Sequence, residues 1–414
     1  MIKKVKGTQD ILSMEAYDTL YAIAQGHFAT AHFIHIQTPI IEPLALFKRS
    51  VGEDTDIVGK EMYTFSTNDR ETLCLRPEAT ASTIRAYCEA AITTKPWQVF
   101  SHGPMFRHER PQKGRWRQFS QFNVESINSS SIALDVRFIA LLDALFAEKL
   151  NFKEYVLNIN FLGNSDDRRQ HKQALRAFLA THQAELCTTC QQRAETNTLR
   201  IFDCKNPACQ ELYTKAPLIT DYLSAESTAE WEELNYLLDV LSINRVHNPL
   251  LVRGLDYYNK VVFEFSSPLL GAQNTFCGGG HYDLSAAFER KEPLPSIGAA
   301  IGMERLLLLL EAADSPLVRP KNPPVIGILP FEKELMPLAL LADQTLRRHN
   351  IQTTLLAEGL KKGMKKANAD ALRFVLLIGP EEQAQGTLKI KNMADGTEHA
   401  TTQEFLASFI QSLL

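Results

Sequence analysis

The segment from Phe106 to Glu125 is the feature that most constrains how this chain can fold. It places arginines, a lysine and glutamates between two stretches that are typical of β-strands, the first beginning at Trp97. Side chains of a strand alternate between two faces at ~3.3 Å per residue, so one face of the second strand would extend roughly 20 Å. That face can hold a long, polar, phosphorylated ligand, whereas a surface hairpin with a charged tip is the alternative for this segment alone. The side chains on this face are Arg117, Phe119, Gln121, Asn123 and Glu125.

The composition is ordinary for a soluble globular protein. The chain has 414 residues, of which 45% are hydrophobic and 22% charged, which is enough for two or three domains. A net charge of −4 gives no overall attraction to nucleic acid, so such binding would need a local basic surface. The apolar run Leu306–Leu310 is too short to cross a bilayer, and no export signal is visible. Together with seven cysteines, an odd number, these features predict a cytoplasmic protein.

The order of helix and strand signals divides the chain into two domains. We expect the first domain over residues 1–320 and the second over 325–414, joined by a proline-containing linker. Within the first domain, short helical pieces and cysteines over about 162–241 predict a small, mostly helical insertion. A single strand is expected over Phe33–Ile41. In the second domain, buried strands alternate with helices, which predicts a small α/β fold with a mostly parallel sheet.

Four further segments carry charged or glycine residues where strands or helices would end. Leu75–Thr80 places the carboxylate of Glu78 at a strand–helix junction, and Leu251–Tyr258 joins an arginine, an aspartate and two phenols. Cys277–Asp283 is rich in glycine, which lets a backbone approach a ligand closely. Gly298–Arg305 puts an arginine in the first turn of a helix, a position that suits a cation only beside an anion such as phosphate. Each segment alone is more often a surface arginine, a core tyrosine pair or a loop than part of a site, but their coexistence indicates a ligand site.

Taken together, the segments resemble those of class II aminoacyl-tRNA synthetases, and specifically of the histidyl-tRNA synthetase family. Phe106–Arg115 is similar to motif 2 of the class, Gly302–Arg305 to motif 3, and the helix and strand ending at Pro39 to motif 1. Leu251–Tyr258 and Gly278–Asp283 resemble the two peptides peculiar to histidyl enzymes. The resemblance covers nearly the whole chain. It implies an α+β catalytic domain with an antiparallel sheet flanked by helices, a small helical insertion, and a C-terminal α/β anticodon-binding domain.

The resemblance also implies the chemistry. Histidine would react with ATP to form histidyl-adenylate and pyrophosphate, and histidine would then be transferred to the 3′ end of its tRNA. Two anions meet in the first step, so fixed positive charge is required, and the resemblance assigns Arg107 and Arg253 as the catalytic residues. Phe119 would stack on adenine, and Mg²⁺ would bridge phosphates. The residues expected to bind ATP are Arg107, Glu109, Arg115, Phe119 and Arg305.

Selection of histidine requires polar partners for both imidazole nitrogens. A buried partner that is left unpaired rejects a wrong side chain more strongly than a shape mismatch does. We expect Glu125 and Tyr258 to contact the ring, with Tyr257 nearby. The residues expected to bind histidine are Glu78, Thr80, Arg107, Gln121, Glu125, Arg253, Tyr257 and Tyr258.

The remaining partners are histidine tRNA and a second copy of the chain. At the hairpin tip, Gln112, Lys113 and Arg115 are expected to contact the tRNA acceptor end. The run Lys361–Lys366 is a basic patch in the second domain, for which a solvated helix face is the alternative. A homodimer is implied through motif 1. No membrane partner is expected.

The sequence departs from the family in one peptide and carries one unusual cysteine pattern. His281 stands where the family has an arginine, and Leu284 follows Asp283 where the family has a glycine, so Tyr282 is expected in the pocket rather than His281. Two close cysteine pairs can build a zinc site, but reduced thiols are the favoured interpretation because histidyl enzymes do not generally depend on zinc. These cysteines are Cys187, Cys190, Cys204 and Cys209.

A catalytically silent relative is the main alternative function. The regulatory subunit of ATP phosphoribosyltransferase shares the synthetase fold but lacks the C-terminal domain and usually loses parts of motif 2 and of the histidine-specific peptides. This chain keeps residues 325–414 and every residue assigned above, which favours the ligase. A sensor module of the same fold would normally be embedded beside a kinase domain, and the sequence leaves no room for one.

Overall fold

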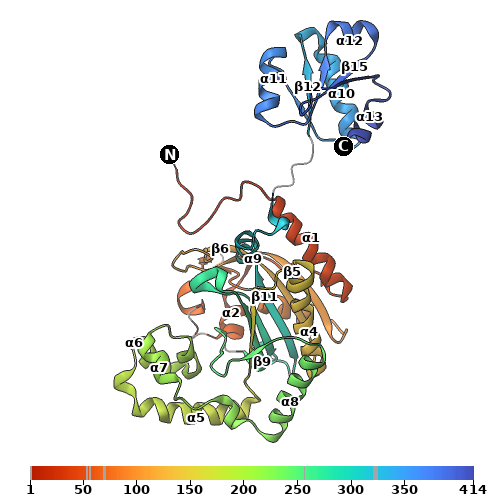
Figure 1. The fold of residues 1–414 in the computed structure, drawn as a ribbon. Coiled ribbons are helices and arrows are strands. Elements are labelled where there is room, and N and C mark those ends of the chain that lie inside the picture. Colours follow the sequence, from red (N-terminus) through yellow and green to blue (C-terminus); the bar gives the residue numbers. More distant parts are fainter. Residues whose placement is uncertain (1, 53–54, 56, 69–70, 256, 320–324) are drawn as a thin grey trace. The chain divides into compact units, whose positions relative to one another are not determined.

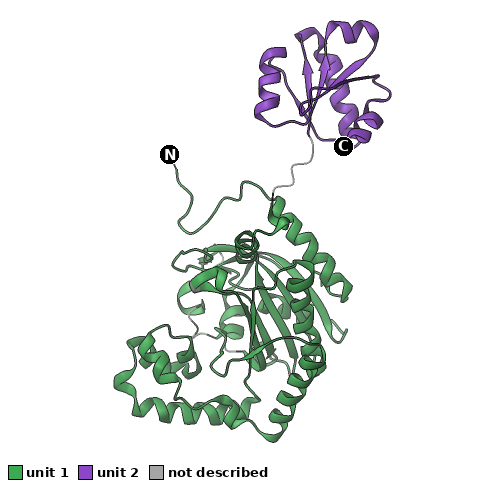
Figure 2. Ribbon diagram, in the orientation of Figure 1, with its two compact units in different colours: residues 1–319 green, residues 320–414 purple. Residues whose placement is uncertain are grey.

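The computed structural model divides into two compact units, residues 1–319 and 320–414, which Figure 2 colours separately. The proline-containing end of the expected linker, residues 320–324, lies outside the described part of the chain, as do Asp69 in an expected turn and Asp256 in the Leu251–Tyr258 peptide. The described residues are 2–52, 55, 57–68, 71–255, 257–319 and 325–414.

The first unit is built on an eight-stranded sheet with the order β1-β5-β6-β11-β10-β9-β7-β8 (Figure 1). Its neighbouring strands are antiparallel, except for the two outer pairs, β1–β5 and β7–β8, which are parallel. The strands are β1 (Ile34–His35), β5 (Trp97–Phe106), β6 (Gln118–Ile127), β7 (Val156–Phe161), β8 (Val246–His247), β9 (Tyr258–Ser266), β10 (Thr275–Asp283) and β11 (Pro295–Gly302).

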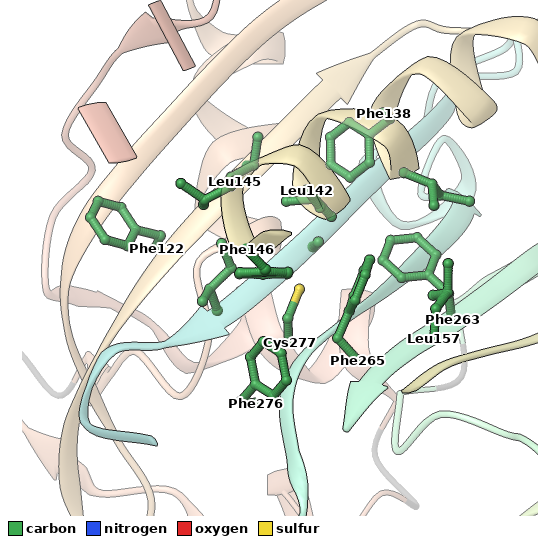
Figure 3. Packing of buried hydrophobic residues seen from close by; sticks show 14 of the residues in the cluster. Phe122, Phe138, Leu142, Leu145, Phe146, Leu157, Phe263, Phe265, Phe276 and Cys277 are labelled. Atoms are coloured by element: carbon green, nitrogen blue, oxygen red, sulfur yellow. The ribbon is translucent and has the colours of Figure 1, made fainter. Parts of the chain in front are cut away.

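One face of this sheet carries the main hydrophobic core. Phenylalanines of the helical segment over residues 132–149 contact phenylalanines of β9 and β10, as Figure 3 shows for Phe146, Phe265 and Phe276. The ring centroids of Phe146 and Phe276 lie 4.9 Å apart in an edge-to-face arrangement, which is a favourable geometry for aromatic pairs. The helices that contribute to this core are α1 (Glu15–Thr30), α4 (Ile132–Ala144), the π-helical η2 (Leu145–Lys149), α8 (Ala225–Val240) and α9 (Met303–Ala312).

The leucine run is the core-facing side of α9 rather than a membrane segment. Leu306, Leu309 and Leu310 are buried in the core, at the three- and four-residue spacing that places side chains on one face of a helix. Among the residues that the structure describes, no helix is both long and apolar enough to cross a bilayer.

The opposite face of the sheet is only partly covered by smaller elements. A second core there joins a three-stranded sheet of order β2-β4-β3 with helices α2 and α3. The prediction of one strand over Phe33–Ile41 is wrong, because β1 pairs with β5 whereas β2 pairs with β4, and Thr38 and Pro39 lie between them. The fully buried Arg76 fixes the segment between β1 and β2. It donates hydrogen bonds to the carbonyl oxygens of Thr38 and Pro104, each at 3.0 Å. The elements are β2 (Ile41–Pro43), α2 (Leu44–Val51), the π-helical η1 (Ile57–Glu61), β3 (Thr64–Ser66), β4 (Thr72–Leu75) and α3 (Thr80–Glu89).

Between β7 and β8 the chain forms the helical insertion, which lies beside the sheet. The first of its helices starts with a capping box in which Asn164 Oδ1 accepts from the Asp167 amide and Asp167 Oδ2 accepts from the Asn164 amide, both at 3.0 Å. Figure 1 shows α5, α6 and α7 together beside the sheet, and they have a core of their own. The elements are α5 (Ser165–Thr181), η3 (Gln183–Glu185), α6 (Thr188–Thr196), η4 (Thr198–Asp203), α7 (Pro207–Tyr213) and η5 (Ile219–Tyr222), followed by α8.

The second unit contains a five-stranded sheet with the order β13-β12-β14-β15-β16. The first three of these strands are parallel, as predicted, but β14, β15 and β16 are antiparallel. The sheet is therefore mixed, because the short helix α12 and the αL conformation of Gly386 return the chain directly into a neighbouring strand. The elements are β12 (Ile326–Pro330), α10 (Met336–Arg348), β13 (Thr353–Leu355), α11 (Leu360–Ala369), β14 (Phe374–Ile378), α12 (Pro380–Gln385), β15 (Leu388–Asn392), β16 (Glu398–Thr401) and α13 (Leu406–Leu413).

Candidate active site

A pocket of about 560 Å³ opens on the partly covered face of the large sheet. Its volume lies within the usual range for small-molecule sites, ~300–1,000 Å³. It draws side chains from β6, β9, β10, β11, the start of α9 and the helical insertion. The residues of the predicted site that line it are Glu78, Thr80, Arg107, Glu109, Arg115, Phe119, Gln121, Arg253, Tyr257, Tyr258 and Arg305.

The side chains of β6 alternate between the pocket and the core. Phe119, Gln121 and Asn123 line the pocket, whereas Phe122 and Val124 are fully buried in the core on the other face. Strand parity therefore places an aromatic ring and two amides in one row, as predicted. By strict alternation Trp116 would share the face of Phe122 and Val124, but it also lines the pocket, because it precedes the first residue of the strand.

Glu125, the next side chain on this face of β6, is only 1% exposed and is not itself a lining residue of the pocket, but it is hydrogen-bonded to Thr80, which is. Thr80 Oγ1 donates to its Oε1 at 2.6 Å, and the Tyr282 hydroxyl donates to its Oε2 at 2.7 Å. Burial raises the pKa of Glu125 to about 8, although these two hydrogen bonds act in the opposite direction. A carboxylate can accept about four hydrogen bonds, so Glu125 keeps capacity for further donors.

Tyr257 and Tyr258 line the end of the pocket near Glu125, and the ring of the buried Tyr282 packs against both of them. The ring centroid of Tyr257 lies 4.7 Å from that of Tyr258 and 5.4 Å from that of Tyr282. Tyr282, expected in the pocket from the sequence, contacts Glu125 directly. In contrast, His281 points to the other face of β10, where its Nδ1 lies 2.9 Å from Asp135 Oδ2.

Two buried amide atoms beside this end have no hydrogen-bond partner among the described residues. They are Gln121 Oε1 and Asn123 Nδ2, and both side chains line the pocket. Leaving a buried polar atom unpaired costs free energy, ~1–3 kcal/mol for each group. A ligand with its own donors and acceptors at this end would therefore bind in preference to an apolar one.

Glu78 is fixed by the helix that follows it. Its Oε2 accepts from the Thr80 amide at 2.6 Å and its Oε1 accepts from the Ala81 amide at 3.0 Å, so the carboxylate caps the N-terminus of α3. These bonds hold the carboxyl group at the favourable end of the helix dipole, although burial raises the pKa of Glu78 despite them. Glu78 thus has a structural role that the sequence did not reveal, and its carboxylate still lines the pocket.

Arg253 lies against the glycine-rich strand. A Cβ placed on Gly278 would overlap its guanidinium group, so a larger residue here would displace the Arg253 guanidinium. Glu264 of β9 forms an ion pair with Arg253 and accepts from Thr275 Oγ1 at 2.8 Å. Sequence reasoning missed Glu264, although a single carboxylate between Val262 and Phe265 in a buried strand was a usable signal.

Arginines gather at the other end of the pocket. The Arg107 guanidinium lies 5.4 Å from the ring centroid of Phe119, and Arg115 forms an ion pair with Glu109. Arg305 Nε donates to the Gly114 carbonyl oxygen at 2.8 Å. Burial, and then the charges of Arg115 and Arg107, lower the pKa of Arg305 to about 10. The positive charges at this end therefore repel one another, and a bound polyanion would relieve that repulsion.

The start of α9 is tied to β6 beside these arginines. Both carboxylate oxygens of Glu304 accept from the Ser120 amide, at 2.8 and 3.0 Å. Burial raises the pKa of Glu304 to about 6. Glu304 was not predicted as a site residue, yet it lines the pocket next to Arg305.

The helical insertion forms one wall of the pocket, which sequence reasoning missed entirely. Its lining residues are separated in sequence by about fifty positions from Arg253, so no local pattern indicates their proximity. They are Arg193, Arg200, Asp203 and Lys205.

At the tip of the hairpin, Gln112 and Lys113 do not line the pocket, whereas Gly114 and Arg115 do. Gln112 and Lys113 are exposed, and Gly114 takes a φ of +75°, which glycine adopts without strain. The Gln112 and Arg115 backbones close the turn by exchanging two hydrogen bonds, at 3.1 and 2.9 Å. The predicted tRNA-contacting residues therefore occupy an accessible turn whose last residue reaches back to the pocket.

Comparison with known proteins gives matches along the whole chain. A family model described as "Histidyl-tRNA synthetase" matches residues 7–306, and one described as "Anticodon binding domain" matches residues 325–413. A histidine–tRNA ligase of Neisseria meningitidis is 42% identical over 406 residues, covering 95% of this chain and 94% of that protein. One from Fervidobacterium nodosum is 38% identical, covering 100% and 99%. The crystal structure of apo S. aureus histidyl-tRNA synthetase has a TM-score of 0.81 at 29% identity, covering 99% of each chain.

The fold and the pocket together define the class. The chain has the features of a class II aminoacyl-tRNA synthetase. These are a large, mainly antiparallel sheet, a long hairpin and a helix with an arginine in its first turn, all of them around one pocket. The second unit is the anticodon-binding domain that accompanies it. Within that class, the chain belongs to the histidyl-tRNA synthetase family.

Proposed function

We propose that this chain joins L-histidine to the 3′ end of its tRNA in two steps, using ATP. The observation that carries the proposal is the polarity of one pocket. A repelling group of arginines lies at one end. At the other end lie Thr80 and two tyrosines, with the buried Glu125 hydrogen-bonded to Thr80, and a row of β6 side chains lies between the two ends. Such a pocket suits a ligand with several negative charges at one end and a polar ring at the other.

ATP would occupy the arginine end. Phe119 offers its ring to adenine, and Arg107, Arg115 and Arg305 offer fixed positive charge to the triphosphate. Such charge assists the reaction because it is in place before negative charge develops on the reacting phosphate. Glu109 would hold Arg115 through its ion pair.

The residues of this end also fit Mg²⁺, which the family uses with ATP. The carboxylates of Glu264 and Glu304 line the pocket, and oxygen atoms are the ligands that Mg²⁺ prefers. When bound, Mg²⁺ would offset phosphate charge. The ion pair from Arg253 and the amide of Ser120 hold these two carboxylates in place.

Histidine would occupy the opposite end. Its imidazole N–H would donate to Glu125, and Tyr258 would contact the ring beside Tyr257. Its ammonium group would be held by Glu78, Thr80 and Gln121, of which Gln121 Oε1 needs a donor. The residue next to the reacting groups would be Arg253, which would bind the histidine carboxylate.

Two reactions follow from this arrangement. A histidine carboxylate oxygen attacks the α-phosphorus of ATP, a new O–P bond forms, and pyrophosphate leaves with the electrons of the broken bond. A hydroxyl of the terminal tRNA ribose then attacks the histidyl carbonyl, and AMP leaves. Arg107 would stabilise the charge at the phosphorus in the first reaction, and no covalent bond to the enzyme is needed.

The same proposal extends to the partners. Gln112, Lys113 and Arg115 would contact the tRNA acceptor end, and the second unit would bind the anticodon. Two copies of the chain would form the working enzyme.

Histidine-dependent exchange of pyrophosphate into ATP, followed by charging of histidine tRNA, tests the proposal. We expect both reactions with histidine and neither with the other amino acids. A regulatory subunit of ATP phosphoribosyltransferase would bind ligands without exchange, so absence of exchange in folded protein would refute the proposal.

A further inference from the structure

Four cysteines of the insertion converge on one point. They come in two pairs, Cys187 with Cys190 around the start of α6, and Cys204 with Cys209 around the start of α7. Their four sulfur atoms all lie within 4.8 Å of one another. Three of the four side chains are buried in the small core of the insertion, and none of the four cysteines lines the pocket of the candidate active site.

The distances fit a tetrahedral metal site better than a disulfide. Cys187 Sγ and Cys204 Sγ lie 3.8 Å apart, far longer than an S–S bond, and none of these cysteines is in a disulfide. Four sulfurs at a Zn–S distance of about 2.3 Å in tetrahedral geometry are about 3.8 Å from one another. A closure of less than an ångström would therefore bring all four sulfurs to bonding distance of one ion.

Hydrogen-bond donors surround the sulfur atoms. The Cys187 amide donates to Cys209 Sγ and the Asn206 amide donates to Cys204 Sγ, both at 3.4 Å. The Tyr213 hydroxyl is buried beside Cys190 and Cys209, and it has no oxygen or nitrogen partner among the described residues. Donors directed at sulfur are typical of the outer shell of a metal site, because they disperse the charge of the coordinated thiolates.

We propose that Cys187, Cys190, Cys204 and Cys209 bind one Zn²⁺ as a structural tetrathiolate site. Soft sulfur ligands in tetrahedral arrangement select zinc over harder divalent ions, and four protein ligands leave no open position for catalysis. The general independence of histidyl enzymes from zinc, which favoured reduced thiols from the sequence, does not bear on a site formed by this chain's own cysteines.

The proposed zinc site lies next in sequence to residues of the insertion that line the pocket. Arg193, Arg200 and Asp203 all lie between the second and third ligands, and Arg193 Nη1 donates to the Arg200 carbonyl oxygen at 3.0 Å. The ion would close this loop and join α6 to α7, which have few buried residues of their own. It would therefore order the wall of the pocket that the insertion supplies.

Metal analysis of the full chain tests the proposal. Protein purified without a metal-affinity column should contain one zinc per chain by mass spectrometry. Replacement of zinc by Co²⁺ should give visible absorption with the sulfur-to-cobalt charge transfer of a tetrathiolate site. Metal-free or iron-containing protein, or a cobalt spectrum without thiolate charge transfer, would overturn the proposal.

Substitution identifies the ligands. Cys204→Ser should lose at least nine-tenths of the zinc and become more sensitive to proteolysis between residues 187 and 209. The matched control is Cys88→Ser, since Cys88 lies in α3, outside the cluster, and should keep one zinc per chain. Full zinc content in Cys204→Ser would disprove the site, and the cobalt spectrum of the unsubstituted chain decides the question if that variant does not fold.

Discussion

At the residue scale, Glu125 is expected both to select histidine and to make the stability of the fold depend on pH. Its two hydrogen bonds come from Thr80 and Tyr282, and burial raises its pKa to about 8. Once histidine is bound and Glu125 is ionised, a hydrogen bond from a ring N–H to the carboxylate is worth ~1.5–3 kcal/mol, because one partner is charged.

Glu125→Gln should therefore lower kcat/KM for histidine by about 100-fold, which is the loss of one charged hydrogen bond near the upper end of that range. The amide keeps the size of the side chain, so KM for ATP should change little. Pyrophosphate exchange measured against histidine and ATP concentration separates the two effects. An unchanged kcat/KM for histidine would contradict the assignment of Glu125 to the ring.

The same substitution should alter the pH dependence of stability. The pKa of Glu125 is about 8 in the folded chain and near 4.5 when unfolded, so between these values the folded state binds the additional proton. Stability of the wild type should fall as pH rises through this window, by at most roughly 5 kcal/mol. Because glutamine does not titrate, Tm of Glu125→Gln relative to the wild type should rise between pH 5 and pH 8.5 in calorimetry. A constant difference would show that Glu125 ionises normally.

At the element scale, the pocket depends on the close pairing of β11 with β6. Gly298 is the residue opposite Glu125 in this pairing, and a Cβ placed on it would overlap the Glu125 carboxylate. The second glycine with this role is Gly278, which admits Arg253. Glycine is thus required here by close packing, since neither residue has a positive φ.

Gly298→Ala should displace Glu125 and lower the rate of histidine-dependent exchange by roughly 100-fold, the usual cost of misplacing a binding group by about 1 Å. The matched control is Gly26→Ala in α1, where a Cβ would meet no atom within 4 Å and alanine favours the helix. Exchange at fixed ATP measures both variants. Equal rates would show that the carboxylate can move without loss of function.

At the scale of the whole molecule, apolar side chains remain exposed on the short strands near the N-terminus of the first unit. Ile34, Ile41 and Phe65 are 59%, 50% and 39% exposed, and they lie on β1, β2 and β3. Exposed apolar residues on the edges of sheets are a liability in a monomer and are typical of interfaces. They support the proposed homodimer, because motif 1 lies in this region.

The wild type should be a dimer, with twice the 46.6 kDa mass of one chain. Ile41→Glu should be a monomer at micromolar concentration, because the glutamate would be buried in the dimer interface without a partner. Leu340→Glu is the control, since Leu340 is 51% exposed in the second unit. Sedimentation velocity measures the masses. A wild-type monomer, or equal dimerisation of both variants, would refute this interface.

The alternation of side chains along the sequence was enough to predict part of the candidate site. The two-residue period of β6 placed Phe119, Gln121 and Glu125 on one face, because that period depends only on neighbours in the chain. The residues that the pattern missed lie in contacts between distant segments: Glu264 beside Arg253, and the insertion wall that includes Asp203.

Only the tertiary structure decided how distant segments combine. It split the expected strand over Phe33–Ile41 between two sheets, turned His281 away from the pocket, and joined Thr80 and Tyr282 on Glu125. The physical reason is that strand pairing and burial depend on segments far apart in the chain, whereas the sequence records directly only the alternation within each segment. The hairpin from Phe106 to Glu125 could therefore be predicted from its own residues, but the pocket around it could not.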